Sequence, residues 1–179
     1  MVVKICGIRE YEDALLCARE GADLIGFVFA ESPRRIEPEK ARDIILRVRE
    51  EFKKKPLFVG VFANQDMEEV MEGVEISGVD MVQLAGDETP SFISPIPKPK
   101  IKSLSPDTDL VLIDEYIKSG AIILLDSRKG DRYGGTGEVV DWDRARYVAE
   151  RFPIILAGGL SPENVKEAVR RVRPWGVDV

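Results

Sequence analysis

Two side chains that can transfer protons follow apolar, strand-like runs of this sequence. Cys6 ends the run "VVKIC" and is followed at once by Gly7, and Asp126 follows the run "AIILL". The chain contains no histidine, which excludes serine-histidine-aspartate triads, cysteine-histidine pairs and histidine-based zinc sites. Carboxylates, lysines, tyrosines and two thiols are therefore left for proton transfer.

Each of these two residues also has a purely structural interpretation. Cys6 could fill a gap in the core as a small hydrophobic side chain, and Asp126 could cap a helix or pair with Arg128. As a catalytic group, a buried carboxyl has a raised pKa and can act as a general acid near neutral pH. A thiol acting as a base needs a nearby positive charge or backbone NH dipoles to lower its pKa from about 8.5. The second cysteine, Cys17, lies in the helical segment "ALLCARE", and we expect it in the core.

Several loops carry further candidates for binding. Gly158 and Gly159 precede an expected helix, where backbone NH groups and the helix dipole favour an anion such as phosphate, although a plain tight turn is the alternative. Arg34 could clamp a carboxylate, whereas we expect Arg35 to be solvated. Residues 128–138 contain four glycines and form either a lid over a substrate or a floppy loop. We expect ordinary loop charges at Glu31, Asp87 and Glu88.

The elements that must position these residues are short apolar runs alternating with segments of helical spacing. We expect strands over Val2–Cys6, Leu24–Phe29, Leu57–Phe62, Met81–Leu84, Lys100–Leu104, Ile122–Asp126, Ile154–Ala157 and Gly176–Val179. We expect helices over Glu12–Glu20, Pro38–Lys54, Asp66–Ile76, Thr108–Lys118, Asp141–Arg151 and Pro162–Val172. Ser161 is the expected cap of the last helix, and glycines mark helix ends at Gly21, Gly78 and Gly120.

Strict alternation of strands and helices predicts an α/β fold with a parallel sheet covered by helices. Eight strands favour a closed (β/α)₈ TIM barrel, with an open doubly wound sheet as the alternative. The fourth connection, "TPSFISPIPKPK", contains four prolines and has room for at most a turn or two of helix. The sequence given stops at the eighth strand and lacks an eighth helix. We expect one domain over residues 1–179.

Charge and hydropathy restrict the partners and the location. The chain has 26 basic and 32 acidic residues, and its net charge of -6 argues against nucleic acid or an anionic membrane as a partner. No apolar run approaches the roughly 20 residues that span a bilayer, and no signal peptide is recognisable, so we expect a cytoplasmic protein. The two cysteines fall on different elements, and we expect no disulfide.

In this order, the motifs resemble those of phosphoribosylanthranilate isomerases, a family of small (β/α)₈ barrels in tryptophan biosynthesis. The matching stretches are "VKICGI", "GADLIGFVF" with "SPRRI", "VGVF", "VQLAG", "ILLDS" with "YGGTG", "LAGGLSPENV" and "RPWGVDV". The resemblance runs the whole length of the chain. It implies an Amadori rearrangement of N-(5-phosphoribosyl)anthranilate to 1-(2-carboxyphenylamino)-1-deoxyribulose 5-phosphate. The expected partner is this small phosphosugar alone, with no cofactor and no metal, and the expected assembly is a monomer or a homodimer.

The resemblance also implies a role for each matching residue. Asp126 matches the general acid that protonates the furanose ring oxygen, and Cys6 matches the general base that takes a proton from C2 of the sugar. Arg34 matches an arginine near the anthranilate carboxylate. The positions expected to bind substrate are Arg34, Gln83, Gly135, Gly158, Gly159 and Asp178.

Three features depart from the family pattern. The short fourth connection could open one side of the barrel wall. Ala85 stands where family members usually carry a histidine, so no imidazole contact to the substrate is expected at that position. The family also continues beyond "VDV" with a serine and glycine loop and a last helix, and we expect that the sequence given omits this tail.

Two other functions are compatible with the residues. A different phosphosugar isomerase, such as an epimerase or a triose-phosphate isomerase, is disfavoured because such enzymes need histidines that this chain lacks. A phosphate-ligand-binding barrel, weak or inactive as a catalyst, would be recognised by tight binding of a product analogue without turnover.

Overall fold

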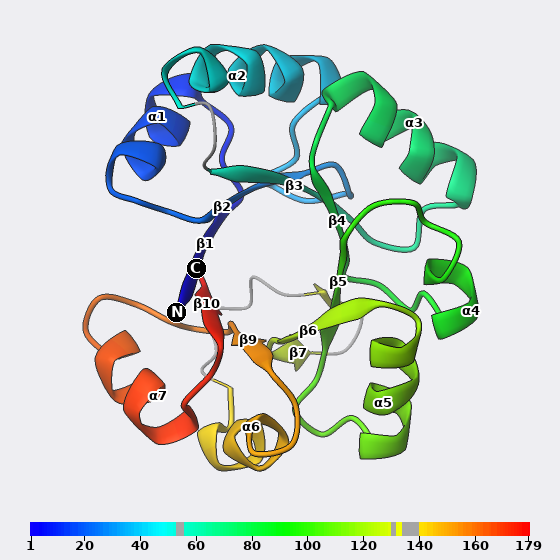
Figure 1. The fold of residues 1–179 in the computed structure, drawn as a ribbon, viewed down its shortest axis with the longest axis vertical. Coiled ribbons are helices and arrows are strands. Elements are labelled where there is room, and N and C mark those ends of the chain that lie inside the picture. The colour runs from blue at the N-terminus through cyan, green and yellow to red at the C-terminus, as the bar shows by residue number, and fades with distance from the viewer. Residues whose placement is uncertain (53–55, 130–131, 134–139) are drawn as a thin grey trace.

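The computed structural model describes residues 1–52, 56–129, 132–133 and 140–179. Eight parallel strands form a closed barrel in the spatial order β1-β10-β9-β6-β5-β4-β3-β2 (Figure 1). The strands are β1 (Val2–Cys6), β2 (Leu24–Val28), β3 (Leu57–Phe62), β4 (Met81–Leu84), β5 (Lys100–Leu104), β6 (Ala121–Leu125), β9 (Ile154–Leu156) and β10 (Gly176–Asp178). The expected closed barrel is thus confirmed, and the open sheet is wrong.

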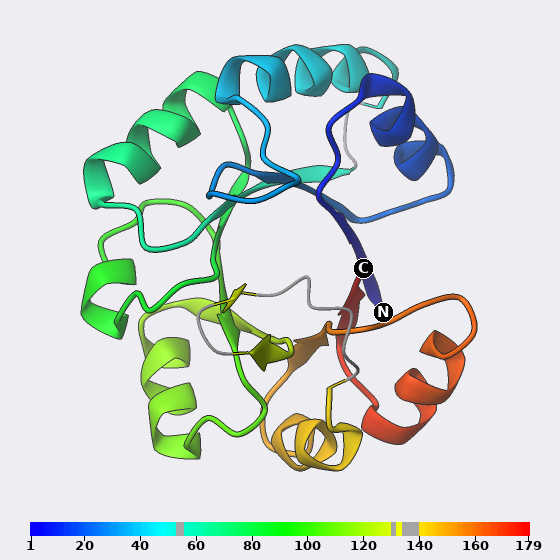
Figure 2. The same ribbon diagram turned by 180° about the vertical axis from the view of Figure 1, so that it is seen from behind.

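Helices form the outer ring of the barrel in both views (Figures 1 and 2). They are α1 (Tyr11–Arg19), α2 (Pro38–Glu51), α3 (Met67–Ser77), α4 (Pro90–Ile93), α5 (Leu110–Lys118), α6 (Trp142–Ala149) and α7 (Val165–Val172). The short α4 agrees with the proline-rich fourth connection. Seven helices are present in the described part of the chain, which is consistent with the expected lack of an eighth. No helix among the described residues is long and apolar enough to cross a membrane.

The expected helix starts and strand ends need small corrections. Residues 162–164 form turns before α7, which begins at Val165 rather than Pro162, and its N-cap residue is Asn164 rather than Ser161. The strand that precedes Asp126 ends at Leu125, so this carboxyl lies just beyond the strand. A short antiparallel pair, β7 (Arg128–Lys129) with β8 (Arg132–Tyr133), was not expected in the segment interpreted as a lid or a floppy loop. The rest of that segment lies outside the described residues.

Two apolar layers hold the barrel together. The larger one packs the outward faces of the strands against the helices. The smaller one fills the barrel interior with Leu24, Val59, Met81, Ile101, Leu124, Ile155 and Ala157, and Val2 and Ile122 pack against it. Successive side chains of a strand point to opposite faces. Residues two positions beyond this layer therefore also face the interior, nearer the carboxyl ends of the strands.

Candidate active site

That alternation brings polar side chains together at the carboxyl ends of the barrel strands. Val2, Met81, Ile101, Leu124 and Gly176 lie in or beside the interior layer. The interior positions that follow them are Lys4 and Cys6 on β1, Gln83 on β4, Ser103 on β5, Asp126 after β6 and Asp178 on β10. In barrels of this kind, the carboxyl ends of the strands carry the active site.

Cys6 occupies the last position of β1, where its backbone is firmly held. Its NH donates a hydrogen bond to the Val179 carbonyl at 2.7 Å, and its carbonyl accepts one from Nη1 of Arg34 at 3.2 Å. The next residue, Gly7, has a φ of +86°, which L side chains rarely adopt. A Cβ at Gly7 would also lie 2.7 Å from Cδ of Arg34. The chain turn behind the thiol therefore requires glycine.

Lys4 is a member of this site that the sequence analysis missed. Its side chain is fully buried, and its Nζ donates to Oδ2 of Asp178 at 2.9 Å, across the seam where β1 pairs with β10. Burial by itself would lower the pKa of Lys4, but the neighbouring Asp178 and Cys6 raise it, so the amine stays charged. The signal in the sequence was a lysine two positions before Cys6 inside an apolar strand, because such a spacing places both on one face.

The partly buried position of Cys6 favours its neutral form. Desolvation raises the pKa of the thiol, and the charge of Asp178 adds to this rise. The charge of Lys4 and, more weakly, the charge of Arg34 act in the opposite direction. The positive charges that a catalytic thiolate needs are thus present, but they do not overcome the effect of desolvation.

Asp126 lies partly buried just beyond β6. Its NH donates to the Leu104 carbonyl at 3.0 Å, and its Oδ1 accepts from the Ser127 NH at 2.7 Å. Desolvation raises its pKa from 3.8 to about 6, and the negative charge of Asp178 contributes, while hydrogen bonds from Ser127 and the charge of Lys4 oppose the rise. No helix starts at Asp126, so it is not a helix cap. The side chain of Arg128, its other expected partner, lies outside the described residues.

The Lys4–Asp178 pair links the two candidate catalytic groups. Both charges act on the thiol of Cys6 and on the carboxyl of Asp126. Asp178 is almost completely buried, and its Oδ1 has no hydrogen-bond partner among the described residues. Leaving a buried carboxylate oxygen without a hydrogen bond costs free energy of folding. Such oxygens occur in binding sites, where a ligand can donate the missing hydrogen bond.

Arg34 and Arg35 lie in different surroundings. Arg35 is exposed and makes a loose ion pair with Glu37 at 3.5 Å. Arg34, although exposed, lies over Gly7 and against the backbone of Cys6. Its guanidinium is therefore the positive group at the edge of the candidate site.

Gly158 and Gly159 both have left-handed backbone conformations, with φ values of +80° and +62°. A Cβ at Gly158 would lie 2.9 Å from the Ser127 nitrogen and 3.1 Å from Oδ1 of Asp126, so this loop lies against the candidate acid. The Asn164 side chain closes the loop by donating to the Gly159 carbonyl at 2.8 Å and accepting from the Ser161 NH at 2.9 Å. Neither glycine NH donates to another described residue.

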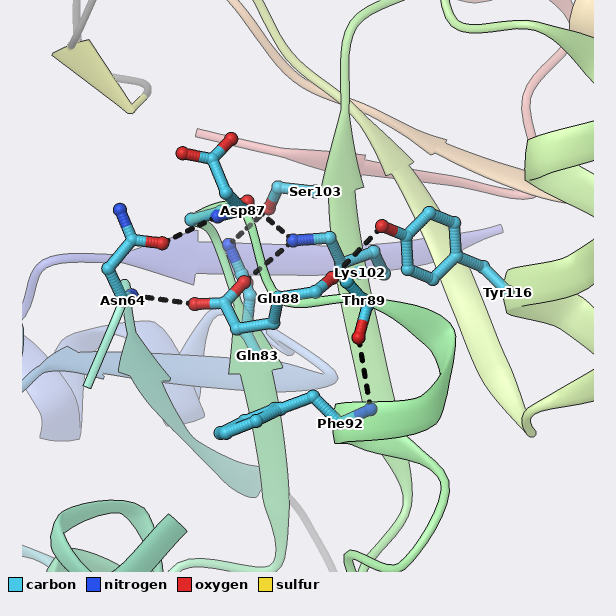
Figure 3. A network of polar contacts seen from close by, with 10 residues as sticks. Asn64, Gln83, Asp87, Glu88, Thr89, Phe92, Lys102, Ser103 and Tyr116 are labelled. Atoms are coloured by element: carbon cyan, nitrogen blue, oxygen red, sulfur yellow. Dashed lines mark hydrogen bonds and ion pairs between the residues drawn. The ribbon is translucent and has the colours of Figure 1, made fainter. Parts of the chain in front are cut away.

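Gln83 faces the interior beside a second buried network (Figure 3). Its Nε2 donates to Oγ of Ser103 at 3.1 Å, while its Oε1 is buried with no partner among the described residues. On the opposite face of the neighbouring strand, Lys102 donates to the Gly86 carbonyl at 2.6 Å and to Oε2 of Glu88 at 2.7 Å. The Gln83–Ser103 bond thus joins β4 to β5, while Lys102 holds the loop after β4.

Glu88 corrects an expectation, because it is not an ordinary loop charge. Its side chain is almost completely buried, its Oε1 accepts from the Asn64 NH at 2.7 Å, and its carbonyl accepts from the Tyr116 hydroxyl at 2.9 Å (Figure 3). The only signal for this in the sequence is indirect, because Lys102 lies in an apolar strand and needs a carboxylate partner there. Glu31 and Asp87 are exposed, as expected.

The remaining expectations concern residues away from this cluster. Gly135, expected to bind substrate, lies outside the described residues. Cys17 is partly buried and packs against the main core, and both cysteines are free. Ala85 lies at the carboxyl end of β4, packed with Cys6 against a small apolar cluster. Within the described ranges, no group of three acidic, histidine or cysteine side chains is arranged to hold a metal ion.

Comparison with known proteins gives one consistent family. Residues 3–179 match the family described as N-(5'phosphoribosyl)anthranilate (PRA) isomerase. The N-(5'-phosphoribosyl)anthranilate isomerase of Syntrophus aciditrophicus is 45% identical over 181 residues, which cover 99% of this chain and 76% of the relative.

Solved structures agree with the sequence comparison. The phosphoribosyl anthranilate isomerase of Thermus thermophilus has a TM-score of 0.84 and 36% identity, and the match covers all of this chain and 86% of that one. A phosphoribosyl anthranilate isomerase solved with reduced 1-(O-carboxyphenylamino)-1-deoxyribulose 5-phosphate has a TM-score of 0.79 and 35% identity, with 100% and 87% of the two chains covered.

Proposed function

The chain belongs to the N-(5'-phosphoribosyl)anthranilate isomerase family of tryptophan biosynthesis, and from this premise we propose that Cys6 and Asp126 are its base and acid. The substrate is N-(5-phosphoribosyl)anthranilate, and the product is 1-(2-carboxyphenylamino)-1-deoxyribulose 5-phosphate. The observation that carries the assignment is that both groups, 120 positions apart in the sequence, interact with the same buried Lys4–Asp178 pair.

Asp126 starts the reaction as the general acid. Its pKa of about 6 keeps about a tenth of the carboxyl protonated at pH 7, so it can donate a proton to the furanose ring oxygen. The C1–O bond then breaks, and the nitrogen lone pair forms the C1–N double bond of an open-chain Schiff base.

Cys6 completes the rearrangement as the general base. Its thiolate removes the proton from C2, and the electrons of that C–H bond form an enolamine while the Schiff-base nitrogen becomes neutral. Tautomerisation of the enolamine, by loss of the C2 hydroxyl proton and protonation of C1, gives the ketone. Because a general acid and a general base each contribute about 10² to 10⁴ in rate, the loss of either should be severe.

The other site residues would hold the two ends of the substrate. Arg34 is the cation available for the anthranilate carboxylate. The NH groups of Gly158 and Gly159 are suited to the phosphate, and the unpaired oxygens of Gln83 and Asp178 are suited to accept hydrogen bonds from sugar hydroxyls. We extend the proposal to a cytoplasmic location, in keeping with a biosynthetic enzyme that acts on a phosphosugar.

Single-turnover kinetics of three variants test the assignment. Cys6→Ala and Asp126→Asn should each lower the rate of isomerisation by about 10² to 10⁴. Cys17→Ala removes the other thiol, which packs against the core on α1, and should keep the rate of the unmodified enzyme. Undiminished isomerisation by both site variants would refute the roles, and tight product-analogue binding by a wild-type protein without turnover would refute the activity.

A further inference from the structure

We propose, as a deepening of the proposed function, that Lys4 is a positioning residue for the base. Its ammonium group holds the Asp178 carboxylate on one side and provides the counter-charge for the Cys6 thiolate on the other. The proposal explains why a fully buried lysine lies inside the barrel, next to the one thiol that faces the interior.

The contacts of Lys4 place its charge between these two groups. Its Nζ donates to Oδ2 of Asp178 at 2.9 Å, and its pKa is raised by the neighbouring thiol of Cys6 as well as by Asp178. A Cβ at Gly26, on the neighbouring β2, would lie 2.8 Å from Sγ of Cys6 and 3.3 Å from Nζ of Lys4. The sulfur of Cys6 and the ammonium group of Lys4 thus both lie against Gly26, which has no side chain to separate them.

The charges that act on the thiol come from three elements. Lys4 on β1 and Arg34 in the loop after β2 favour the thiolate, whereas Asp178 on β10 disfavours it. Asp126 after β6 faces Lys4 and Asp178. Of the two cations, Lys4 has the larger effect on Cys6, and it is buried whereas Arg34 is exposed. In a water-poor site, the ammonium is therefore the main group that can offset the cost of forming a thiolate.

The alternative is that the Lys4–Asp178 ion pair only stabilises the fold. The chain contains a second buried ion pair, away from Cys6, that can serve as a control. Lys102 is also fully buried and pairs with a buried carboxylate, Glu88, at 2.7 Å (Figure 3). It belongs to the face of the barrel wall that is turned toward the helices, opposite to the interior-facing Ser103. Loss of Lys102 removes a buried ammonium without touching Cys6.

The first test measures thiolate formation directly, in a Cys17→Ala background that leaves Cys6 as the only thiol. The rate of alkylation by iodoacetamide is recorded against pH, and its midpoint gives the pKa of Cys6. Lys4→Met should raise this pKa by about 1 to 3 units, the usual effect of losing an opposite charge at this range. Lys102→Met should leave it unchanged. An unchanged midpoint in Lys4→Met, or equal shifts in both variants, would overturn the proposal.

Lys4→Met leaves the buried carboxylate of Asp178 without its partner, so this variant could fail to fold. A second variant is therefore needed to decide the question. Lys4→Met combined with Asp178→Asn leaves neither buried charge unpaired. Because the effect of Lys4 on the thiol exceeds that of Asp178, the double variant should still have a higher Cys6 pKa than the parent. A pKa equal to or below the parent value would count against Lys4.

Enzyme kinetics separate a failure of this inference from a failure of the proposed function. In Lys4→Met, kcat/KM should fall about 10- to 1000-fold relative to the parent below the pKa of the thiol, and this deficit should shrink at alkaline pH, where the thiol ionises in both proteins. A structural defect would lower activity at every pH. If the parent enzyme does not isomerise the substrate, the proposed function fails, while the alkylation result still decides whether Lys4 controls the thiol.

Discussion

At the scale of single residues, burial decides the protonation state of the candidate acid and base. Desolvation raises the pKa of both Cys6 and Asp126, but the consequences differ. For Asp126, a rise to about 6 places the titration near neutral pH, where a general acid is most useful. For Cys6, desolvation disfavours the thiolate that a base needs. The charge of Lys4 lowers the pKa of the thiol and so opposes this effect.

The raised pKa of Asp126 predicts a pH-dependent cost in stability. Between pH 3.8 and about 6, the folded protein binds the proton that the unfolded chain has lost, so stability falls as the pH rises and the full cost is present above pH 6. Asp126→Asn lacks this titration. Its free energy of unfolding relative to wild type should therefore increase from pH 4 to pH 7, by up to about 3 kcal/mol.

Urea unfolding of the two proteins at both pH values measures this difference. The same titration should appear in the kinetics of the wild-type enzyme, where kcat/KM should stop rising above pH 6, because the loss of the Asp126 proton then offsets the gain in Cys6 thiolate. A stability difference that is constant between pH 4 and pH 7 would contradict the raised pKa.

At the scale of elements, two buried lysines tie loops and strands together on opposite sides of the barrel wall. Lys4 joins β1 to β10 inside the barrel, and Lys102 joins β5 to the loop before α4 on its outer side. The very short α4 gives this loop little helical support, so the buried pair and the Tyr116 hydroxyl anchor it instead. On β5, Ser103 contacts Gln83 from the interior face of the barrel, and Lys102 contacts Glu88 from the outer face (Figure 3).

Loss of the Lys102 side chain should destabilise the protein severely. Lys102→Met leaves the buried carboxylate of Glu88 without its cation, and breaking a buried pair in this way costs about 3 to 5 kcal/mol. Denaturant unfolding of the variant measures the loss. Lys118→Met removes a lysine from an exposed pair with Asp114 on α5 and should leave the unfolding midpoint nearly unchanged. Similar midpoints for the two variants would show that the buried pair is not an anchor.

At the scale of the whole molecule, β10 closes the barrel. It pairs with β1 on one side and β9 on the other, and the chain ends meet at this seam (Figure 1). The interior apolar layer and the polar layer above it are continuous only because this strand is in place. The pairing of β10 therefore closes the barrel and also places Asp178 beside Lys4.

Removal of residues 176–179 should open the barrel. The deletion takes away the pairing of β1, the partner of Lys4 and the acceptor for the Cys6 NH. We expect loss of the near-UV circular dichroism and binding of a hydrophobic dye, the signs of lost side-chain packing. Val179→Ser, which keeps the backbone and changes an exposed side chain, should retain the wild-type signals. Native signals from the deleted chain would refute the role of β10.

The sequence by itself determined the strands and the edge where the chemistry lies. Strand runs are visible locally because apolar, β-branched residues recur with sharp ends, and parallel strands present all their carboxyl ends at one edge. Cys6 ends one such run and Asp126 follows another, so their placement at the carboxyl ends of the barrel strands could be predicted without coordinates. The short fourth helix followed from prolines, which act on their own backbone.

Only the tertiary structure decided the partners of the buried charges. Lys4 and Asp178 are 174 positions apart, and their pairing depends on the register between the first and last strands. Glu88 looked like a solvated charge because nothing near it in the sequence reveals that Tyr116 and Lys102 enclose it. Secondary structure reflects neighbouring residues, whereas burial and pKa depend on which distant segments the closed barrel brings together, and that is why the first could be predicted and the second could not.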